Sequence, residues 1–460
     1  MLNVSMPANI CKAIPAYLDV YWEKVHHIFP IVHRRTFEAA GEHIDVLRCA
    51  MAAVATQYFL KWDVPVMQAI LLCEFFARFR GRRAAIRPSK EFESVYSGVS
   101  DTAAIFAPIP QTGPNTVRWH NWLEMESRRR ILAACFVLDV HSSAYLDQQR
   151  LRTFDIATDG MPHIPLIGLT NDLWEAASPD TWATMVTSRG SISGEQTLLS
   201  LVDLDTLSAT SIDTYVPFDR AIILAFEAVM LSNQVEPAKV DSYRETSEPK
   251  MFRMANIFPE CPTANTYLAL HHTPLHDLLA VSGDSWIFSQ KVLQPKSFAE
   301  HQKRLKEWSD SGNAAVAVVF ACRALRAFTE YGNYAEDSDD EDDDMDAWEM
   351  GRPRMWKDDI SDYWGMYVCA LICWAYGDRT GRGEESGGEG SGGDDSAALR
   401  WVRTVASMRT GDVLGLRSTK DAALVVALVK RWLDEDCIGG RSRLYVDAVG
   451  VLKKLEEGVA

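Results

Sequence analysis

The chain has 460 residues, of which 47% are hydrophobic and 24% are charged, and its formal net charge is −16. This composition is typical of a globular protein and supplies ample apolar material for a large core. The acidic balance argues against a general nucleic-acid-binding body, because binding to phosphates needs clustered cations. The 14 tryptophans favour wide contacts between helices, since large aromatic side chains bury much surface.

The nine cysteines are odd in number, scattered, and found mostly in apolar segments. No Cys-x-x-Cys occurs, so the usual zinc spacings are absent, and we interpret the cysteines as buried thiols of a reducing compartment. Cys369 and Cys373 lie one helical turn apart without a neighbouring His or Cys pair, and we expect no metal there. The sequence has no secretory signal and no uncharged apolar run of about 20 residues. We therefore expect a soluble intracellular protein with no membrane partner.

Helical spacing begins near the N-terminus, where Tyr17, Tyr21, Val25 and Ile28 predict a first helix that ends before Pro30. Residues 29–37 are predicted to form a short extended connection. A second helix is predicted for 45–58, and a third opens at Pro65.

The last turns of this third helix carry four arginines, Arg78, Arg80, Arg82 and Arg83. Cations at the carboxyl end of a helix complement its dipole, which is a purely structural interpretation. A phosphate site is the alternative. Residues 88–114 follow and are predicted to be rich in loops.

The stretch from Arg118 to Leu146 is predicted to be a helix that changes character halfway. Its first part is polar, whereas residues 131–140 are apolar on nearly every face, as in a helix buried inside a larger protein. Two acids precede arginines by four residues, the favourable order for helical ion pairs: Glu124 before Arg128, and Glu126 before Arg130. We expect a buried arginine–carboxylate network that includes the following residues: Arg128, Arg129, Arg130 and Asp139.

The rest of the chain alternates helical patterns with loops and two biased inserts. Residues 153–179 are punctuated by prolines. Helices are predicted over 218–231, 264–281, 298–308, 314–331, 360–376, 422–433 and 444–455. The run 336–349 has acids at most positions and is expected to be disordered, with an activation segment as the less favoured interpretation. Residues 381–396 form a flexible Gly/Ser/acid insert.

Three arrangements deserve a chemical test. Asp339–Asp343 has the D-D-x-x-D spacing that binds magnesium in prenyl-diphosphate enzymes, but it lies in a charge run without apolar periodicity, so we favour a solvated loop. The pairs His26–His27 and His271–His272 diverge by about 100° on a helix and cannot readily share one metal. Asp139, His141 and Ser142 lie on one helix, and spacing alone does not supply the geometry of a catalytic triad. We predict no catalytic, cofactor-binding or metal-binding residue.

Two motifs resemble a known family. The first is YWEKVHHIFPIVHRRTF, in which His26, Phe29, Pro30, His33, Thr36 and Phe37 fit an aromatic element of that family, although His26–His27 replaces the usual His-Pro. The second is WLEMESRRRILAACFVLD with the preceding tryptophan, and its matching residues are Trp119, Trp122, Glu126, Arg128, Arg129, Arg130, Phe136, Leu138 and Asp139. Together they resemble the fungal-specific transcription factor regulatory domain, most like the subgroup attached to two-Cys-two-His or binuclear zinc cluster modules.

The resemblance implies an all-helical regulatory region that acts on transcription by RNA polymerase II in the nucleus. It implies contacts with the transcription machinery or related transcription factors, allows a homodimer, and assigns no catalytic role. No cofactor is expected in this chain, and zinc is expected only in an upstream DNA-binding module that is missing from it. DNA would be reached only through that module.

The sequence therefore predicts an all-α fold: a large irregular multi-helix domain with disordered acidic and Gly/Ser-rich inserts. We divide the chain into a helical regulatory domain at 10–335, an acidic linker at 336–353, and a C-terminal helical part at 354–460 that packs on the same body and contains the insert 381–396. Two alternatives remain. One is a helical scaffold or dominant-negative partner that regulates intact relatives without binding DNA. The other is a magnesium-dependent helical prenyl-diphosphate enzyme that uses Asp339–Asp343.

Overall fold

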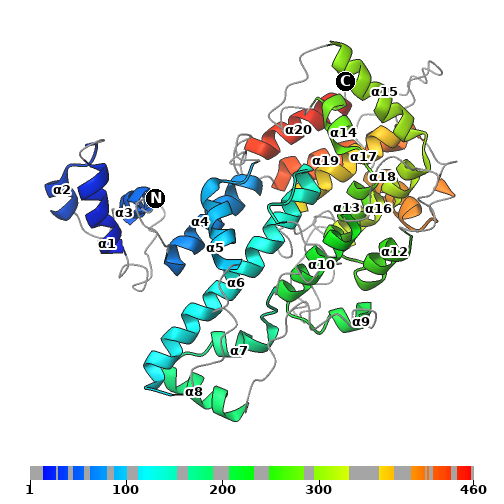
Figure 1. Cartoon of the computed structure of the whole chain (residues 1–460). Helices are drawn as coiled ribbons and strands as arrows, with labels where there is room; N and C mark the ends of the chain where they lie inside the picture. The colour runs from blue at the N-terminus through cyan, green and yellow to red at the C-terminus, as the bar shows by residue number, and fades with distance from the viewer. Residues whose placement is uncertain are drawn as a thin grey trace, which may run out of the picture. The chain divides into compact units, whose positions relative to one another are not determined.

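The computed structural model describes the chain over the ranges 14–26, 30–39, 45–55, 63–79, 87–100, 112–152, 164–189, 207–232, 248–283, 295–330, 362–377, 395–409, 412–413, 418–436 and 443–456. These residues form α-helices with one π-helical turn, η2, and one short 3-10 helix, η7 (Gly168–Thr170), and no β-strand is found among them (Figure 1). The predicted all-α class is therefore confirmed. The acidic run 336–349, including Asp339–Asp343, lies outside the described residues.

Contacts divide the chain into two compact units. Unit 1 comprises residues 1–73 and 90–131, and unit 2 comprises residues 74–89 and 132–460. Helices α4 (Val64–Phe79) and α6 (Asn115–Leu146) continue across the unit boundaries. The predicted division at 10–335, 336–353 and 354–460 follows a different criterion and stays a prediction.

The N-terminal helices of unit 1 pack around aromatic side chains. These helices are α1 (Ile14–Val20), η2 (Tyr21–Val25), α2 (Arg34–Ala39) and α3 (Asp45–Ala55). Tyr17, Tyr21, Phe37 and Met51 belong to their shared core, and the Trp22 ring meets the Phe37 ring edge-on at 5.5 Å. The motif of the first family element thus forms a small hydrophobic cluster.

Two predictions in unit 1 are wrong. The supposedly extended 29–37 segment contains the start of α2, where the His33 imidazole accepts a hydrogen bond from the Thr36 backbone N–H at 3.4 Å. The loop-rich region after residue 88 contains α5 (Lys90–Ser100). Its buried residues Phe92, Val95, Tyr96 and Val99 recur at helical spacing, a pattern that the surrounding prolines obscured.

Unit 2 contains the remaining helices: α7 (Asn171–Trp174), α8 (Pro179–Ser188), α9 (Ala209–Ile212), α10 (Pro217–Ser232), α12 (Glu248–Ile257), α13 (Pro262–His271), α14 (Leu275–Val281), α15 (Pro295–Ser309), α16 (Gly312–Glu330), α17 (Asp362–Gly377), α18 (Asp395–Ala406), α19 (Thr419–Asp436) and α20 (Arg443–Glu456). Extensive packing joins α13 to α16, α16 to α17, and α17 to α19. The residues from Tyr363 to Tyr376 are almost all buried, as predicted for a helix that is apolar on all sides.

Glycine permits the close approach of α17 to its neighbours. A Cβ at Gly365 would lie 3.3 Å from Phe328 Cζ and 3.3 Å from Thr266 Oγ1. A Cβ at Gly377 would lie 2.5 Å from the Ala422 Cβ, a separation that side chains do not tolerate. The packing layer of α13, α16, α17 and α19 therefore depends on two positions without side chains.

Several helices of unit 2 differ from the predictions. The predicted helix 264–281 is two helices, α13 and α14, because Pro274 starts a new one after His271. Helices α7, α8, α9, α12 and α18 are not predicted from the sequence, and α18 begins inside the predicted insert 381–396. Buried Ala398, Trp401, Val402 and Val405 form the apolar stripe of α18.

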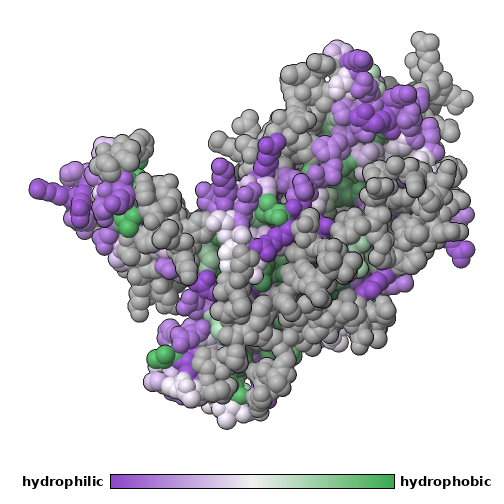
Figure 2. Space-filling model, in the orientation of Figure 1, coloured by the Kyte–Doolittle hydropathy of each residue, from purple (hydrophilic) through white to green (hydrophobic). Residues whose placement is uncertain are grey.

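Within α16, residues 312–329 are long and apolar enough to cross a membrane by length and composition alone, but 67% of this window is buried inside the protein. That burial is typical of a core helix. Figure 2 shows hydrophilic side chains over α15, whose inward residues Leu305 and Trp308 are buried.

Candidate functional site: a buried polar centre

The first half of α6, in unit 1, forms the predicted ion pairs. Arg130 Nε donates to Glu126 Oε1 at 3.0 Å, and Arg129 Nη1 lies 3.8 Å from Glu126 Oε2. Arg128 Nη2 donates to the largely exposed Glu124 at 3.1 Å. Glu126 is almost fully buried and is the shared acid partner of Arg129 and Arg130. This part of the predicted network is therefore confirmed.

In unit 2, α4 supplies an ion pair that was not predicted. Arg78 Nε and Nη2 each lie 2.8 Å from Glu74 Oε1, and both side chains are almost completely buried. The Glu74 carboxylate also accepts the Ser89 backbone N–H at 3.2 and 3.3 Å. A buried carboxylate needs such partners, because removal from water is costly for a charge.

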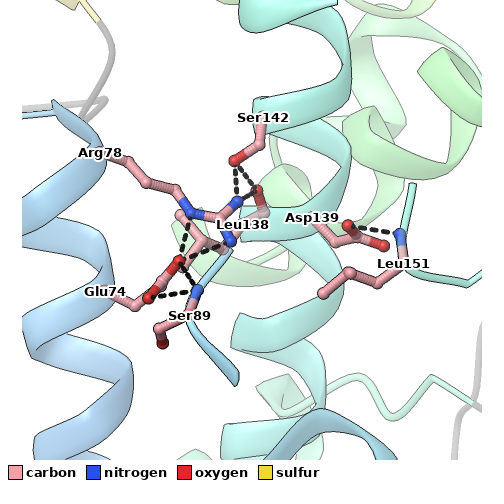
Figure 3. Close-up of polar contacts among 7 residues, drawn as sticks. All are labelled: Glu74, Arg78, Ser89, Leu138, Asp139, Ser142 and Leu151. Carbon is pink, nitrogen blue, oxygen red and sulfur yellow. Dashed lines mark hydrogen bonds and ion pairs between the residues drawn. The ribbon is translucent and has the colours of Figure 1, made fainter. Parts of the chain in front are cut away.

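Arg78 joins α4 to the buried half of α6, as Figure 3 shows. Its Nη1 donates to the Leu138 carbonyl oxygen at 3.4 Å and to the Ser142 hydroxyl oxygen. The Ser142 hydroxyl in turn donates to the Leu138 carbonyl at 2.8 Å. We use the name polar centre for the residues that Figure 3 labels: Glu74, Arg78, Ser89, Leu138, Asp139, Ser142 and Leu151.

Asp139 holds the chain that leaves α6. Its carboxylate accepts the backbone N–H of Leu151 at 3.0 Å and that of Arg152 at 3.4 Å. Burial raises the pKa of Asp139, and these two hydrogen bonds together with nearby Arg78 offset part of the rise. The contacts shown for Asp139 are thus backbone groups, and its predicted pairing with Arg128–Arg130 is wrong. Its partners come after a turn at Asp147, which has a positive φ of 48°.

The carboxyl end of α6 is held by aromatic residues of α13 and α17. His141 Nδ1 and the Tyr267 hydroxyl share a hydrogen bond, and the Tyr145 ring lies 5.4 Å from that of Tyr267. Trp364 Nε1 donates to the Tyr145 carbonyl at 3.1 Å. Asp139, His141 and Ser142 therefore have three separate sets of partners, and they do not form a triad among themselves.

The predicted pair His271–His272 is largely buried, whereas Cys49 and Cys73 are exposed, so the prediction of buried thiols is wrong for these two cysteines. Burial lowers the pKa of His271 and of His272 to about 4, and the two rings meet edge-on at 5.0 Å. His27 and three of the predicted arginines, Arg80, Arg82 and Arg83, lie outside the described residues.

The thiols of α16 and α17 are similarly enclosed. Cys322 Sγ lies 3.9 Å from Cys373 Sγ, and burial raises the pKa of Cys322 and of Cys369. Within the described part of the chain, no three His, Cys, Asp or Glu side chains gather in a way that could hold a metal ion. The pattern is that of protonated structural thiols.

The arrangement as a whole positions helices. Charges of the polar centre are compensated by fixed partners, so they are poorly placed to act on a substrate. A sequence signal for Glu74 and Arg78 existed, because they are charged residues four positions apart in an otherwise apolar helix.

Comparison with known proteins gives the family. The fungal specific transcription factor domain matches residues 53–310. Two curated proteins of Schizosaccharomyces pombe (strain 972 / ATCC 24843) are similar: zinc finger protein klf1, 24% identical over 201 residues, and zinc finger protein zas1, 24% identical over 208 residues. These alignments cover 36% and 37% of this chain but only 25% and 22% of the relatives. No solved structure matches. Since the family match spans more than half of the 460 residues, this chain belongs to the fungal specific transcription factor domain family.

Proposed function

We propose that this chain is the regulatory region of a zinc-dependent transcription factor that acts on RNA polymerase II in the nucleus. The observation that supports it most is the family match over residues 53–310, which assigns the chain to transcription regulation. The two relatives are named zinc finger proteins and are several times longer than the aligned segment. We infer that DNA is reached through a zinc module outside these 460 residues.

The chemistry of the described residues agrees with a regulator rather than a catalyst. Buried charges are compensated by neighbouring groups, and the net charge of −16 opposes direct contact with DNA phosphates. We propose that the helical body binds the transcription machinery or related transcription factors. Its dimerisation also stays a prediction.

A fusion experiment tests this role. The full chain is joined to an unrelated DNA-binding module in fungal cells, and transcription of a reporter is measured. We expect reporter transcription to change several-fold relative to the DNA-binding module alone. A fusion with Lys303→Met, on exposed α15, is expected to behave as the unmodified chain does. Reporter transcription equal to that of the bare module would overturn the proposal.

The acidic net charge also favours a second candidate, a scaffold or dominant-negative partner that does not reach DNA. Chromatin immunoprecipitation of the tagged native protein distinguishes the two. Enrichment at specific promoters supports the transcription factor. Absence of enrichment, together with co-purification of an intact relative, supports the scaffold. We do not favour the magnesium-dependent enzyme, because the family points to a non-enzymatic regulator, and Asp339–Asp343, on which that alternative rests, lies outside the described residues.

A further inference from the structure

A cavity of about 330 Å³ lies between α9, the first turns of α10, and the connection from α12 to α13. Its apolar wall includes four buried side chains, Ile212, Leu224, Ile257 and Phe258. The volume falls at the lower end of small-molecule sites, which typically combine an apolar lining with a few polar groups. All of these residues belong to unit 2.

Arg220 supplies a positive charge to the cavity wall. Its Nη1 atom lies 3.6 Å from Asp213 Oδ1, a separation longer than a hydrogen bond, and the Asp213 side chain is 74% exposed. Exposed ion pairs of this kind stabilise a protein little. The planar guanidinium of Arg220 is therefore available to form two parallel hydrogen bonds with a carboxylate ligand.

Two carboxylates, Asp213 and Glu260, also line the cavity, and each of them already faces an arginine. Glu260 is already held by Arg326 Nη2, at 3.1 and 3.2 Å from its two carboxylate oxygens, so its charge is compensated. Cys261, the N-cap residue of α13, also lines the cavity, and its side chain makes no capping hydrogen bond to that helix. The start of a helix has a partial positive charge, which acts in the same direction as Arg220.

We propose that this cavity is a binding site for a small apolar monocarboxylic acid. The carboxylate pairs with the Arg220 guanidinium, and the apolar body lies against Ile212, Leu224 and Phe258. The site does not depend on the proposed role in transcription, since it follows from the cavity and its charges alone.

The test uses octanoate as the probe, with octan-1-ol and octylamine as controls of equal chain length. Calorimetric titration of the full chain is expected to give about tenfold tighter binding for octanoate than for octan-1-ol. Octanoate should also slow alkylation of Cys261, read by mass spectrometry. Cys49 and Cys73 are exposed, belong to unit 1 and do not line the cavity, so they serve as controls. Octanoate should leave their alkylation rates unchanged.

Two variants locate the site. Arg220→Gln should abolish the preference for octanoate, so that octanoate and octan-1-ol bind equally. Ala221→Phe places a large side chain in the cavity and should weaken both probes, while Lys303→Gln on α15 should weaken neither. Unchanged octanoate affinity in Arg220→Gln, tighter binding of octylamine than of octanoate, or no binding of octanoate would each overturn the proposal. Because Arg220 is partly exposed, its replacement should leave the fold intact, and circular dichroism of the variant checks this.

Discussion

The polar centre around Glu74 and Arg78 and the packing layer of α13, α16, α17 and α19 are both buried in unit 2, but their side chains are of opposite kinds. In the polar centre, Arg78 donates hydrogen bonds to Glu74, Leu138 and Ser142. In the packing layer, α17 approaches its neighbours through Gly365 and Gly377. The stability of the polar centre depends on matched hydrogen-bonding partners. The stability of the packing layer depends on the volume of the side chains where the helices meet.

The two regions therefore respond differently to mutation. In the polar centre, a substitution of similar size can still leave a charge without a partner. In the packing layer, one additional methyl group can force helices apart although no polar group is involved. Arg78→Met changes a charge at nearly constant volume, whereas Gly377→Ala changes the volume without changing a charge.

The largest effect is expected for Arg78→Met, which removes the charge but keeps an extended side chain. Buried Glu74 loses its ionic partner, and we expect the free energy of unfolding to fall by about 3–5 kcal/mol. Lys303→Met is the matched control, because Lys303 and Glu307 also lie one helical turn apart in unit 2 but are 77% and 64% exposed. It should cost less than about 1 kcal/mol.

Urea unfolding of both variants, followed by tryptophan fluorescence, measures these differences. Equal losses in Arg78→Met and Lys303→Met would show that burial does not distinguish the two ion pairs. The double variant Glu74→Leu/Arg78→Met offers a second check. It should be more stable than Arg78→Met alone, since no unpaired charge is left behind.

A smaller effect is expected for Gly377→Ala in the packing layer. The new Cβ would lie 2.5 Å from Ala422 Cβ and 3.0 Å from the Ser418 carbonyl oxygen, so α17 and α19 must separate. Overpacking of this kind costs about 1–3 kcal/mol. Gly450→Ala in α20 is the control, because a Cβ there meets nothing within 4 Å.

The control should change stability in the other direction. Alanine in an open helical position stabilises a protein by about 0.5–1 kcal/mol relative to glycine. Thermal unfolding of the two glycine variants should therefore give melting temperatures on opposite sides of the wild type. A rise in both would show that α17 and α19 accommodate the extra methyl group.

The sequence predicts the packing layer better than the polar centre. The helices of 314–331 and 360–376 were predicted because continuous apolar composition is readable along the chain. The contact that joins α4 to α6 links Arg78 to Ser142, 64 residues apart, and no local pattern specifies such a pair. Only the local half of the network, Glu124 and Glu126 with their arginines, follows from helical spacing.

Asp139 shows the same limit at a single residue. Its position in the family motif and its burial were predicted, but its partners Leu151 and Arg152 come after a turn at Asp147 with a positive φ. A non-glycine residue in that region of φ is uncommon, so no local pattern predicts the change of chain direction at Asp147. Short helices such as α7 and α9 are not predicted, because four residues give too little periodicity.

The smallest effect is expected for Asp139→Asn. The loss of stability in this variant should change with pH in the opposite direction to the loss in Asp277→Asn. Burial raises the pKa of Asp139, so the folded state binds its proton more readily than the unfolded chain does. The stability that Asp139 contributes is then greatest at pH values below the ordinary Asp pKa and decreases as pH rises through the raised value. Asp139→Asn should cost about 1 kcal/mol at low pH and less near neutrality.

Asp277 should show the opposite trend. Burial acts to raise its pKa, but hydrogen bonds from Arg304 and His301 outweigh burial and lower it. The stability contributed by Asp277 is therefore present above the ordinary Asp pKa and is lost as pH falls through the lowered value. The cost of Asp277→Asn should shrink as pH falls, whereas the cost of Asp139→Asn should grow. Urea unfolding of both variants and the wild type between about pH 3 and pH 7, around the ordinary Asp pKa, measures the two slopes. Slopes of the same sign would mean that Asp139 is held by its neighbours as Asp277 is, and that burial does not dominate at the polar centre.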